Sequence, residues 1–240
     1  MIAHFRATAL DPSLDSRFCE EALSTDGEGG RRVYAVIMID MNVLPSSLST
    51  RDKSIREKLR IELAGHTIIE ELGLLHGTVR VDMVVVDENT RTMHGYELKS
   101  DLDTLQRLPE QMKIYNSTLD RVTIVVGRKH LHEAVKLVPS WWGVMLAKIQ
   151  NENDEVSLMT LRIASDNPDD RDSFAIAQLL WRNEALAILE ELEAAKGFRS
   201  KPREFIYRKL ADEINQQDLC GRVRAQLTSR EGWRSVLQPS

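Results

Sequence analysis

The sequence predicts an α/β domain with a mixed β-sheet, followed by a C-terminal helical region. Residues 93–127 read as strand, helix and strand, a unit that gives two parallel strands joined by a right-handed crossover. Residues 80–87 precede this unit across a short polar linker, which predicts an antiparallel hairpin. The chain has a helical pattern from Phe174 onward. A parallel pair beside an antiparallel pair makes a mixed sheet, and helices are expected to cover it.

A helix and a short strand are expected before the hairpin. Residues 52–64 place isoleucine and leucine at helical spacing, and Gly65 ends the pattern. Residues 66–72 form a short run rich in β-formers. Residues 1–50 are assigned to an N-terminal extension, although 31–40, RRVYAVIMID, has the composition of a strand.

The elements after the hairpin continue the alternation of strands and helices. Apolar side chains recur at helical spacing after residue 104, and Pro109 suits the first turn of a helix. The following segments predict strands at 121–127, 142–149 and 156–163, with a helix at 129–139. The C-terminal region predicts one long helix at 174–197 and two more, beginning near Pro202 and Asp218. These segments predict an α/β domain at 51–165 and a helical, basic region at 173–240.

Composition narrows the class of protein. The 240 residues are 42% hydrophobic and 29% charged, which is typical of a globular chain. The sequence has no apolar run long enough for a membrane span and no standard secretory signal, so a soluble, cytoplasmic protein is expected. The net charge is −5, yet 196–240 holds ten Lys/Arg against five Asp/Glu. This asymmetry indicates either a polyanion-binding surface or solvated helix faces with nearby counter-charges.

The hairpin carries charged residues where core strands are expected. If its turn is centred at 89–90, Asp82 faces Glu97 and Arg80 faces Lys99, all on one face of the sheet. Two carboxylates directly opposite each other repel, and a divalent cation between them would remove that cost. A bound metal activates water, and a neighbouring lysine orients it or stabilises an anionic transition state. The alternative is a structural Glu97–Lys99 ion pair at a strand end.

The motifs RVD at 80–82 and YELKS at 96–100 resemble those of the PD-(D/E)XK nuclease superfamily, which has the restriction-endonuclease-like fold. Its αβββαβ core matches the element order expected over 52–127. The resemblance implies that Asp82 and Glu97 bind Mg²⁺ or Mn²⁺ and that Lys99 serves the hydrolytic water. Val81 stands where the superfamily often has proline.

Further motifs extend this resemblance. Gln111 and Tyr115 match a Q-x-x-x-Y motif of several nuclease branches, and both fall on one helix face. The resemblance adds Glu71, or else Glu70, and the carbonyl of Leu98 to the metal ligands. The expected substrate contacts are Arg80, Ser100, Gln111 and Tyr115. The string from 55 to 150 also looks like an uncharacterised bacterial and phage family of small nuclease-like proteins.

Seven basic residues of the helical region are candidates for contact with DNA phosphates. They are Arg199, Lys201, Arg203, Arg208, Lys209, Arg222 and Arg224. The same helices are alternatively a dimerisation surface, which would give a homodimer. The predicted function is a metal-dependent DNA nuclease that hydrolyses phosphodiester bonds. The alternative is a non-catalytic nucleic-acid-binding or regulatory protein that keeps the fold.

Overall fold

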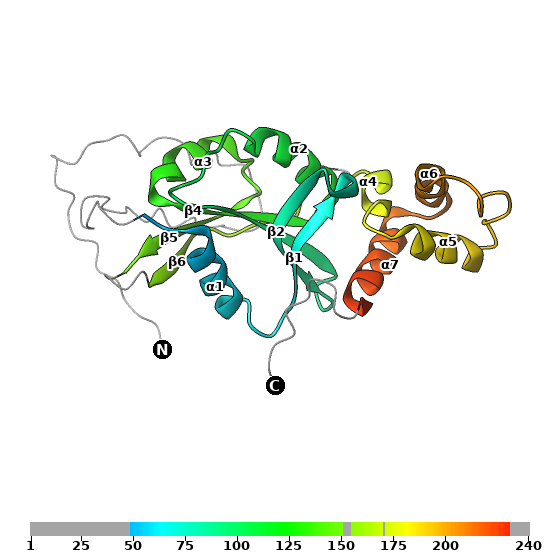
Figure 1. Ribbon diagram of the computed structural model, residues 1–240, viewed down its shortest axis with the longest axis horizontal. Helices are drawn as coiled ribbons and strands as arrows, with labels where there is room; N and C mark the ends of the chain where they lie inside the picture. Colours follow the sequence, from blue (N-terminus) through cyan, green and yellow to red (C-terminus); the bar gives the residue numbers. More distant parts are fainter. Residues whose placement is uncertain (1–48, 151–154, 170, 231–240) are drawn as a thin grey trace, which may run out of the picture. The chain divides into compact units, whose positions relative to one another are not determined.

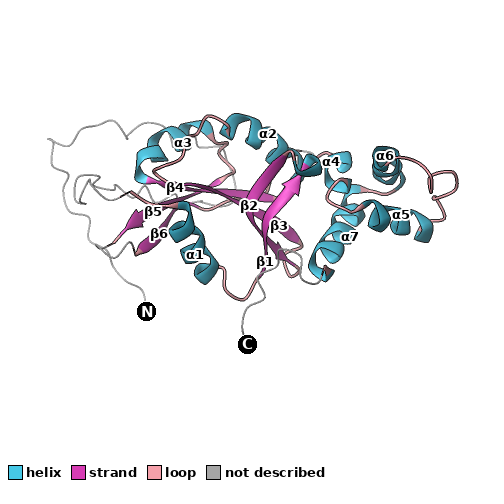
Figure 2. Cartoon of the chain, in the orientation of Figure 1, coloured by secondary structure: helices cyan, strands magenta, loops and turns pink. Residues whose placement is uncertain are grey.

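A six-stranded mixed sheet forms the centre of the part of the chain that the computed structural model describes, residues 49–150, 155–169 and 171–230 (Figures 1 and 2). The strands follow one another across the sheet in chain order: β1 (Thr67–Leu74), β2 (Val79–Asp87), β3 (Thr92–Lys99), β4 (Arg121–Gly127), β5 (Gly143–Ile149) and β6 (Val156–Arg162). The strand expected at 31–40 lies outside the described residues, as does nearly all of the expected N-terminal extension.

The pairing of the strands confirms the predicted α/β class with a mixed sheet. β1, β2 and β3 are antiparallel neighbours, β3, β4 and β5 are parallel, and β6 returns antiparallel to β5. Residues 83–87 and 92–96 have the predicted hairpin register, since Met83 lies opposite Tyr96 and Asp87 lies opposite Thr92, but the pairing ends before the predicted pairs Asp82–Glu97 and Arg80–Lys99. β4 is almost entirely buried, which is typical of a parallel strand that is covered on both faces.

Helix α1 (Asp52–Glu62) covers one face of the sheet (Figure 1). Ile55 and Leu59, one helical turn apart, are fully buried against side chains of the sheet such as Met83 and Tyr96. Their burial fixes which side of α1 faces the strands. The residues beside that stripe, including Arg56, are thereby directed at the sheet.

Helices α2 (Leu108–Thr118) and α3 (Leu131–Leu137) cover the opposite face (Figure 1). Each connects two parallel strands, α2 between β3 and β4 and α3 between β4 and β5. Two short 3₁₀ turns, η1 (Leu75–Gly77) and η2 (Arg128–His130), complete the connections in this part. Because parallel strands need crossovers, the helices lie where the sequence order requires them.

The long helix predicted at 174–197 is wrong, because the chain forms two helices there, α4 (Ser173–Ala177) and α5 (Arg182–Glu191). Trp181 is extended between them, at φ −71° and ψ 155°, and its N–H donates to the Glu184 carboxylate at 2.6 Å. The carbonyl of Leu180 accepts a bond from the Tyr207 hydroxyl at 2.9 Å. These bonds replace those that a continuous helix would make.

Two further helices, α6 (Arg203–Glu213) and α7 (Gln216–Ser229), pack with α4 and α5. The apolar side chains of 174–197 therefore pack against other helices of the same chain. Ile188 and Leu189 belong to the same core as Ile206 and Val223. That core continues without interruption into the face of the sheet under α2 and α3. Within the described residues, every helix is too short or too polar to span a membrane.

Candidate functional site

The candidate site lies where β2 and β3 separate. The pairing of the two strands ends at Met83 and Tyr96, one residue before Asp82 and Glu97. Beyond that point the N–H of Leu98 donates to the side chain of Asp82, Oδ2, at 2.8 Å. The carboxylate of Asp82 thus takes the place of a backbone acceptor and holds the two diverging strands together.

Glu97 is buried under α2, and both of its carboxylate oxygens are engaged. Oε1 accepts bonds from Lys99 Nζ at 2.6 Å and from Gln111 Nε2 at 2.8 Å. Oε2 lies 2.5 Å from the hydroxyl of Tyr115, which is also 2.8 Å from the Arg80 carbonyl oxygen. Gln111 and Tyr115 reach the same carboxylate because they are one helical turn apart on α2.

Arg56 of α1 supplies the cation on the other side of Asp82. Its guanidinium donates to the Asp82 carbonyl at 2.9 Å and to Asp82 Oδ1 at 3.0 Å. It also lies 3.2 Å from Glu71 Oε1 and 3.3 Å from Asp52 Oδ2. A positive side chain therefore bridges two of the carboxylates that were expected to share a metal.

Burial and like charge shape the electrostatics of this group. Burial, together with the nearby charge of Glu97, raises the pKa of Asp82 to about 7, while the Leu98 N–H and Arg56 oppose the rise. Burial and the charge of Glu97 also raise the pKa of the Tyr115 hydroxyl, which therefore remains a neutral donor. Arg56 and Lys99 balance the two carboxylates, so the cluster is a closed network of donors and acceptors.

This donor set does not fit a divalent cation as it stands. Each oxygen of Asp82 and Glu97 already accepts a hydrogen bond from the protein. Among the described residues, no group of three or more His, Cys, Asp or Glu side chains is arranged to hold a metal. A cation between Asp82 and Glu97 would have to displace Arg56 or Lys99. The expected Mg²⁺ or Mn²⁺, with Glu71 and the Leu98 carbonyl as further ligands, stays a prediction.

The remaining residues expected at the site have different surroundings. Glu71 adopts a left-handed conformation, φ 53°, and reaches Arg56, whereas Glu70 pairs with Arg60 of α1. The hydrogen bond from Arg60 lowers the pKa of Glu70. The Arg80 side chain is exposed. Ser100 is buried, and its N–H and hydroxyl both donate to Asp103 in the turn that follows β3.

The sequence reasoning missed Arg56. Two signals point to it: it directly follows Ile55 in a helix whose apolar stripe faces the sheet, and it lies one turn after Asp52. Neither signal shows which carboxylate it meets, since that depends on how α1 crosses the strands.

The seven C-terminal cations expected to contact DNA differ in their ion pairing and in their exposure. Four of them form ion pairs with glutamates: Arg199 with Glu190, Arg208 with Glu204, Lys209 with Glu213 and Arg222 with Glu191. Arg224 is buried, with 6% of its surface exposed. Lys201 and Arg203 are exposed, as are Arg199 and Arg208. The exposed members of the set are therefore concentrated between residues 199 and 208.

Comparison with known proteins identifies relatives of this chain. The family model described as Bacteriophage P4 protein cII matches residues 54–236. Protein cII of Enterobacteria phage P4 is 35% identical over 94 residues, which cover 39% of this chain. The chain spans about a third of that protein's length, 34%. No solved structure matches the chain.

These matches correct the resemblance on which the nuclease hypothesis depended. The chain matches the cII family over most of its length, so its assignment to the PD-(D/E)XK superfamily is wrong. The classification as a nuclease or restriction-endonuclease-like hydrolase is wrong with it, whereas the expected phage relationship agrees with the match. A physical reason lies in the motif itself, because Glu-x-Lys on a strand serves equally well as the internal ion pair of Glu97 and Lys99.

Proposed function

Because this chain belongs to the bacteriophage P4 protein cII family, we propose that it is a regulatory protein that binds nucleic acid without hydrolysing it. The observation that carries this proposal is the charge of the segment from Lys196 to Arg208. Five Lys/Arg side chains in that segment are exposed, against one acidic residue, Glu204. Such a segment supplies phosphate affinity that does not depend on nucleotide sequence.

The acid–base cluster supports the non-catalytic half of the proposal. General acid–base or metal-assisted chemistry needs a group that is free to exchange a proton or to bind a reacting atom. Here both oxygens of Glu97 and the ammonium of Lys99 are used in bonds to one another and to α2. A structural role, joining β3 to the helix above it, accounts for these contacts.

Fluorescence anisotropy of labelled oligonucleotides tests the proposal. We expect binding that weakens steeply with salt, because each phosphate contact releases counterions. Mg²⁺ should not raise the affinity above its value in EDTA, since Arg56 and Lys99 already neutralise the carboxylates. The oligonucleotide should remain intact after long incubation with Mg²⁺ or Mn²⁺.

Two double variants test whether the basic segment itself binds the nucleic acid. Substitution of Lys201 and Arg203 by alanine should weaken binding, whereas the matched pair Lys53→Ala and Lys58→Ala on α1 should not. Absence of binding at low salt would contradict the proposal. Metal-dependent cleavage that disappears in Lys99→Met would contradict the proposal that the protein does not hydrolyse nucleic acid.

The expected homodimer through the C-terminal helices is a separate proposal. The apolar core residues of α4 to α7 pack against one another and against the sheet, whereas Trp181 and Phe205 are exposed, so association through these helices would use polar or aromatic surface. Sedimentation velocity across a range of protein concentrations distinguishes monomer from dimer.

A further inference from the structure

The segment between α5 and α6 gathers positive charge at one place. Residues 196–203, KGFRSKPR, contain four cations and no acidic residue, and all four are exposed. Two residues with positive φ, Glu193 at 57° and Gly197 at 82°, turn the backbone there. The segment is therefore a tight basic loop rather than an extension of either helix.

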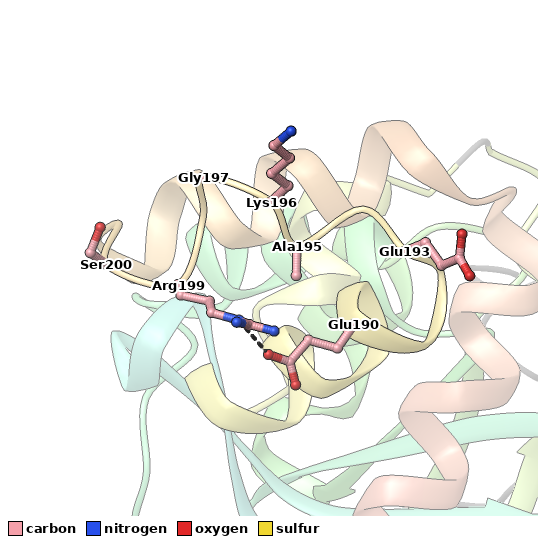
Figure 3. Close-up of a pocket in the computed structure, with 7 residues that line it drawn as sticks. All are labelled: Glu190, Glu193, Ala195, Lys196, Gly197, Arg199 and Ser200. Atoms are coloured by element: carbon pink, nitrogen blue, oxygen red, sulfur yellow. Dashed lines mark hydrogen bonds and ion pairs between the residues drawn. The ribbon is translucent and has the colours of Figure 1, made fainter.

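A hollow of about 450 Å³ lies between the end of α5 and this loop (Figure 3). It is lined by Glu190, Glu193, Ala195, Lys196, Gly197, Arg199 and Ser200. In Figure 3 the Arg199 guanidinium reaches toward Glu190, with which it pairs at 2.8 Å, while Lys196 points away from the loop. Lys196 is thus directed outward, whereas Arg199 is held by a carboxylate.

Two exposed aromatic rings flank the loop. Trp181 at the start of α5 is 51% exposed, and Phe205 in the first turn of α6 is 53% exposed. Large aromatic side chains usually bury most of their surface, as Trp141 and Trp142 do here. Cations already lie over both rings, with Arg230 4.3 Å from the Trp181 ring and Lys201 Nζ 6.0 Å from the Phe205 ring.

Hydrogen bonds join the start of α5 to the basic loop. The guanidinium of Arg182, next to Trp181, donates to the carbonyls of Arg199 at 2.5 Å and Lys201 at 3.2 Å. The start of α5 is thereby fixed to the end of the basic loop, four residues before Phe205. We call the surface formed by Trp181, residues 196–203 and Phe205 the loop face.

We propose that the loop face binds single-stranded nucleic acid, with phosphates at Lys196, Lys201 and Arg203 and bases stacked on Trp181 and Phe205. This inference rests on the proposed nucleic-acid-binding function and names the form of nucleic acid. Base stacking on aromatic rings needs unpaired bases, because a duplex keeps its base faces covered. Charge alone would attract both forms, so the exposed rings are what favours the single strand.

The first experiment compares a labelled 20-nucleotide oligo-dT with a duplex of the same length. We expect tighter binding of the single strand at equal salt. Phe205→Ala should weaken single-strand binding at least fivefold while leaving the salt dependence unchanged, since it removes stacking and no charge. Lys201→Ala with Arg203→Ala should weaken binding and reduce the salt slope by about 1.4, because each lost contact to a single strand removes about 0.7.

Matched controls separate these effects from changes in folding. Ile163→Ala removes an apolar side chain that is 83% exposed and lies outside the loop face. Lys53→Ala with Lys58→Ala removes two charges from α1. Both controls should bind the single strand as the unaltered chain does.

Tryptophan fluorescence provides an independent readout. Stacking should quench the emission of Trp181 when oligo-dT is added, and Trp181→Phe should remove that quenching while keeping an aromatic ring in place. Quenching of equal size in Trp181→Phe would overturn the assignment of Trp181 to the binding surface.

The outcomes distinguish this inference from the proposed function. Equal affinity for single strand and duplex, or a Phe205→Ala variant that behaves like Ile163→Ala, would overturn the loop face as a single-strand site. Nucleic-acid binding itself would then still stand. Failure of the unaltered chain to bind any nucleic acid at low salt would overturn both.

Discussion

Arg56 is the residue on which the charge balance of the Asp82–Glu97 cluster depends. Its side chain is 13% exposed and lies against carboxylates from β1, β2 and its own helix. Removing one partner of a largely buried ion pair leaves the other charge without compensation, which costs more than the pair gains. Arg56 therefore has the same effect on Asp82 that a bound cation would have.

Arg56→Met should lower the free energy of unfolding by about 2–4 kcal/mol, a range reduced from that of fully buried pairs because Glu71 is partly exposed. Lys53→Met on the exposed side of the same helix is the control and should change stability by less than about 0.5 kcal/mol. Urea denaturation at pH 7 measures both. Equal effects of the two substitutions would show that Arg56 does not stabilise the cluster.

A double-mutant cycle then tests whether Arg56 acts through Asp82. The pair Arg56→Met with Asp82→Asn should be more stable than the sum of the single effects predicts, by about 1 kcal/mol or more, because the uncompensated charge is gone. Additive effects would show that Arg56 does not act through the Asp82 carboxylate, which leaves its contacts with Glu71 and Asp52, its bond to the Asp82 carbonyl and the packing of its side chain.

Asp82 should make stability depend on pH. Its pKa rises from 3.8 to about 7 on folding, so between these values the folded chain holds a proton that the unfolded chain has released. The stability that this proton contributes is fully present below pH 4 and is lost as the pH rises through 7. Asp82→Asn removes the titration and keeps an oxygen that can accept the Leu98 N–H.

The unfolding free energy of Asp82→Asn relative to the unaltered chain should therefore increase with pH from 4 to 7, by at most about 1.4 kcal/mol per pH unit. Asp212→Asn, at an exposed position, is the control substitution measured over the same pH range. Burial lowers the pKa of His94 to about 4, but this contribution is common to both proteins and cancels in the difference. A flat difference for Asp82→Asn would contradict the raised pKa.

At the scale of elements, two glycines differ in whether the surrounding structure has room for a side chain. Gly127 ends β4, where a Cβ would lie 2.4 Å from Asp101 Oδ1 and 2.6 Å from Thr50 Oγ1. Asp101 uses that carboxylate to accept bonds from Thr50 and from the Lys129 N–H. Gly221 lies in the middle of α7, where the nearest atom to a Cβ, on Arg224, is 3.9 Å away.

Gly127→Ala should destabilise the protein by about 1–3 kcal/mol, because the new methyl group displaces the Asp101 network. Gly221→Ala should stabilise it by about 0.5–1 kcal/mol, because alanine restricts the unfolded chain and favours the helix. Thermal denaturation followed by circular dichroism measures both. Opposite shifts in Tm are expected, and shifts of the same sign would contradict the packing described for one of the two sites.

The elements also show what a sequence can and cannot predict. The hairpin register was predictable, since a polar turn between two alternating strands leaves few pairings, and it places Asp82 and Glu97 one residue beyond the last pair, Met83 and Tyr96. The break between α4 and α5 was not, because the apolar pattern runs through it. The bond from Tyr207 of α6 to the Leu180 carbonyl helps to end the first helix, and contacts between distant segments leave no local pattern. The contacts of Arg56 with β1 and β2 also join distant segments, so they too could not be predicted from the local sequence.

At the scale of the whole described chain, the sheet and the C-terminal helices share one apolar core. Ile124 of β4 belongs to the same buried cluster as Ile206 of α6 and Leu219 of α7. Polar contacts reinforce the connection, since Arg171 pairs with Asp120 at 2.6 Å and the Asp172 N–H donates to the Ser117 carbonyl at 2.9 Å. A shared core of this kind implies that the helices do not unfold without exposing part of the sheet.

Cys220 can report on this cooperativity, because its thiol is buried in α7 with 3% of its surface exposed. The chain has two cysteines, so Cys19→Ser leaves Cys220 as the one thiol to be labelled. If the helices and the sheet unfold together, the opening free energy from the rate of thiol labelling should equal the unfolding free energy from urea denaturation.

A second variant, Ser229→Cys with Cys220→Ser and Cys19→Ser, places the thiol at an exposed position and should label at the rate of an unprotected cysteine. Labelling of Cys220 at an opening free energy well below the global value would show that α4 to α7 open while the sheet remains folded. The loop face would then belong to a segment that can move independently of the Asp82–Glu97 cluster.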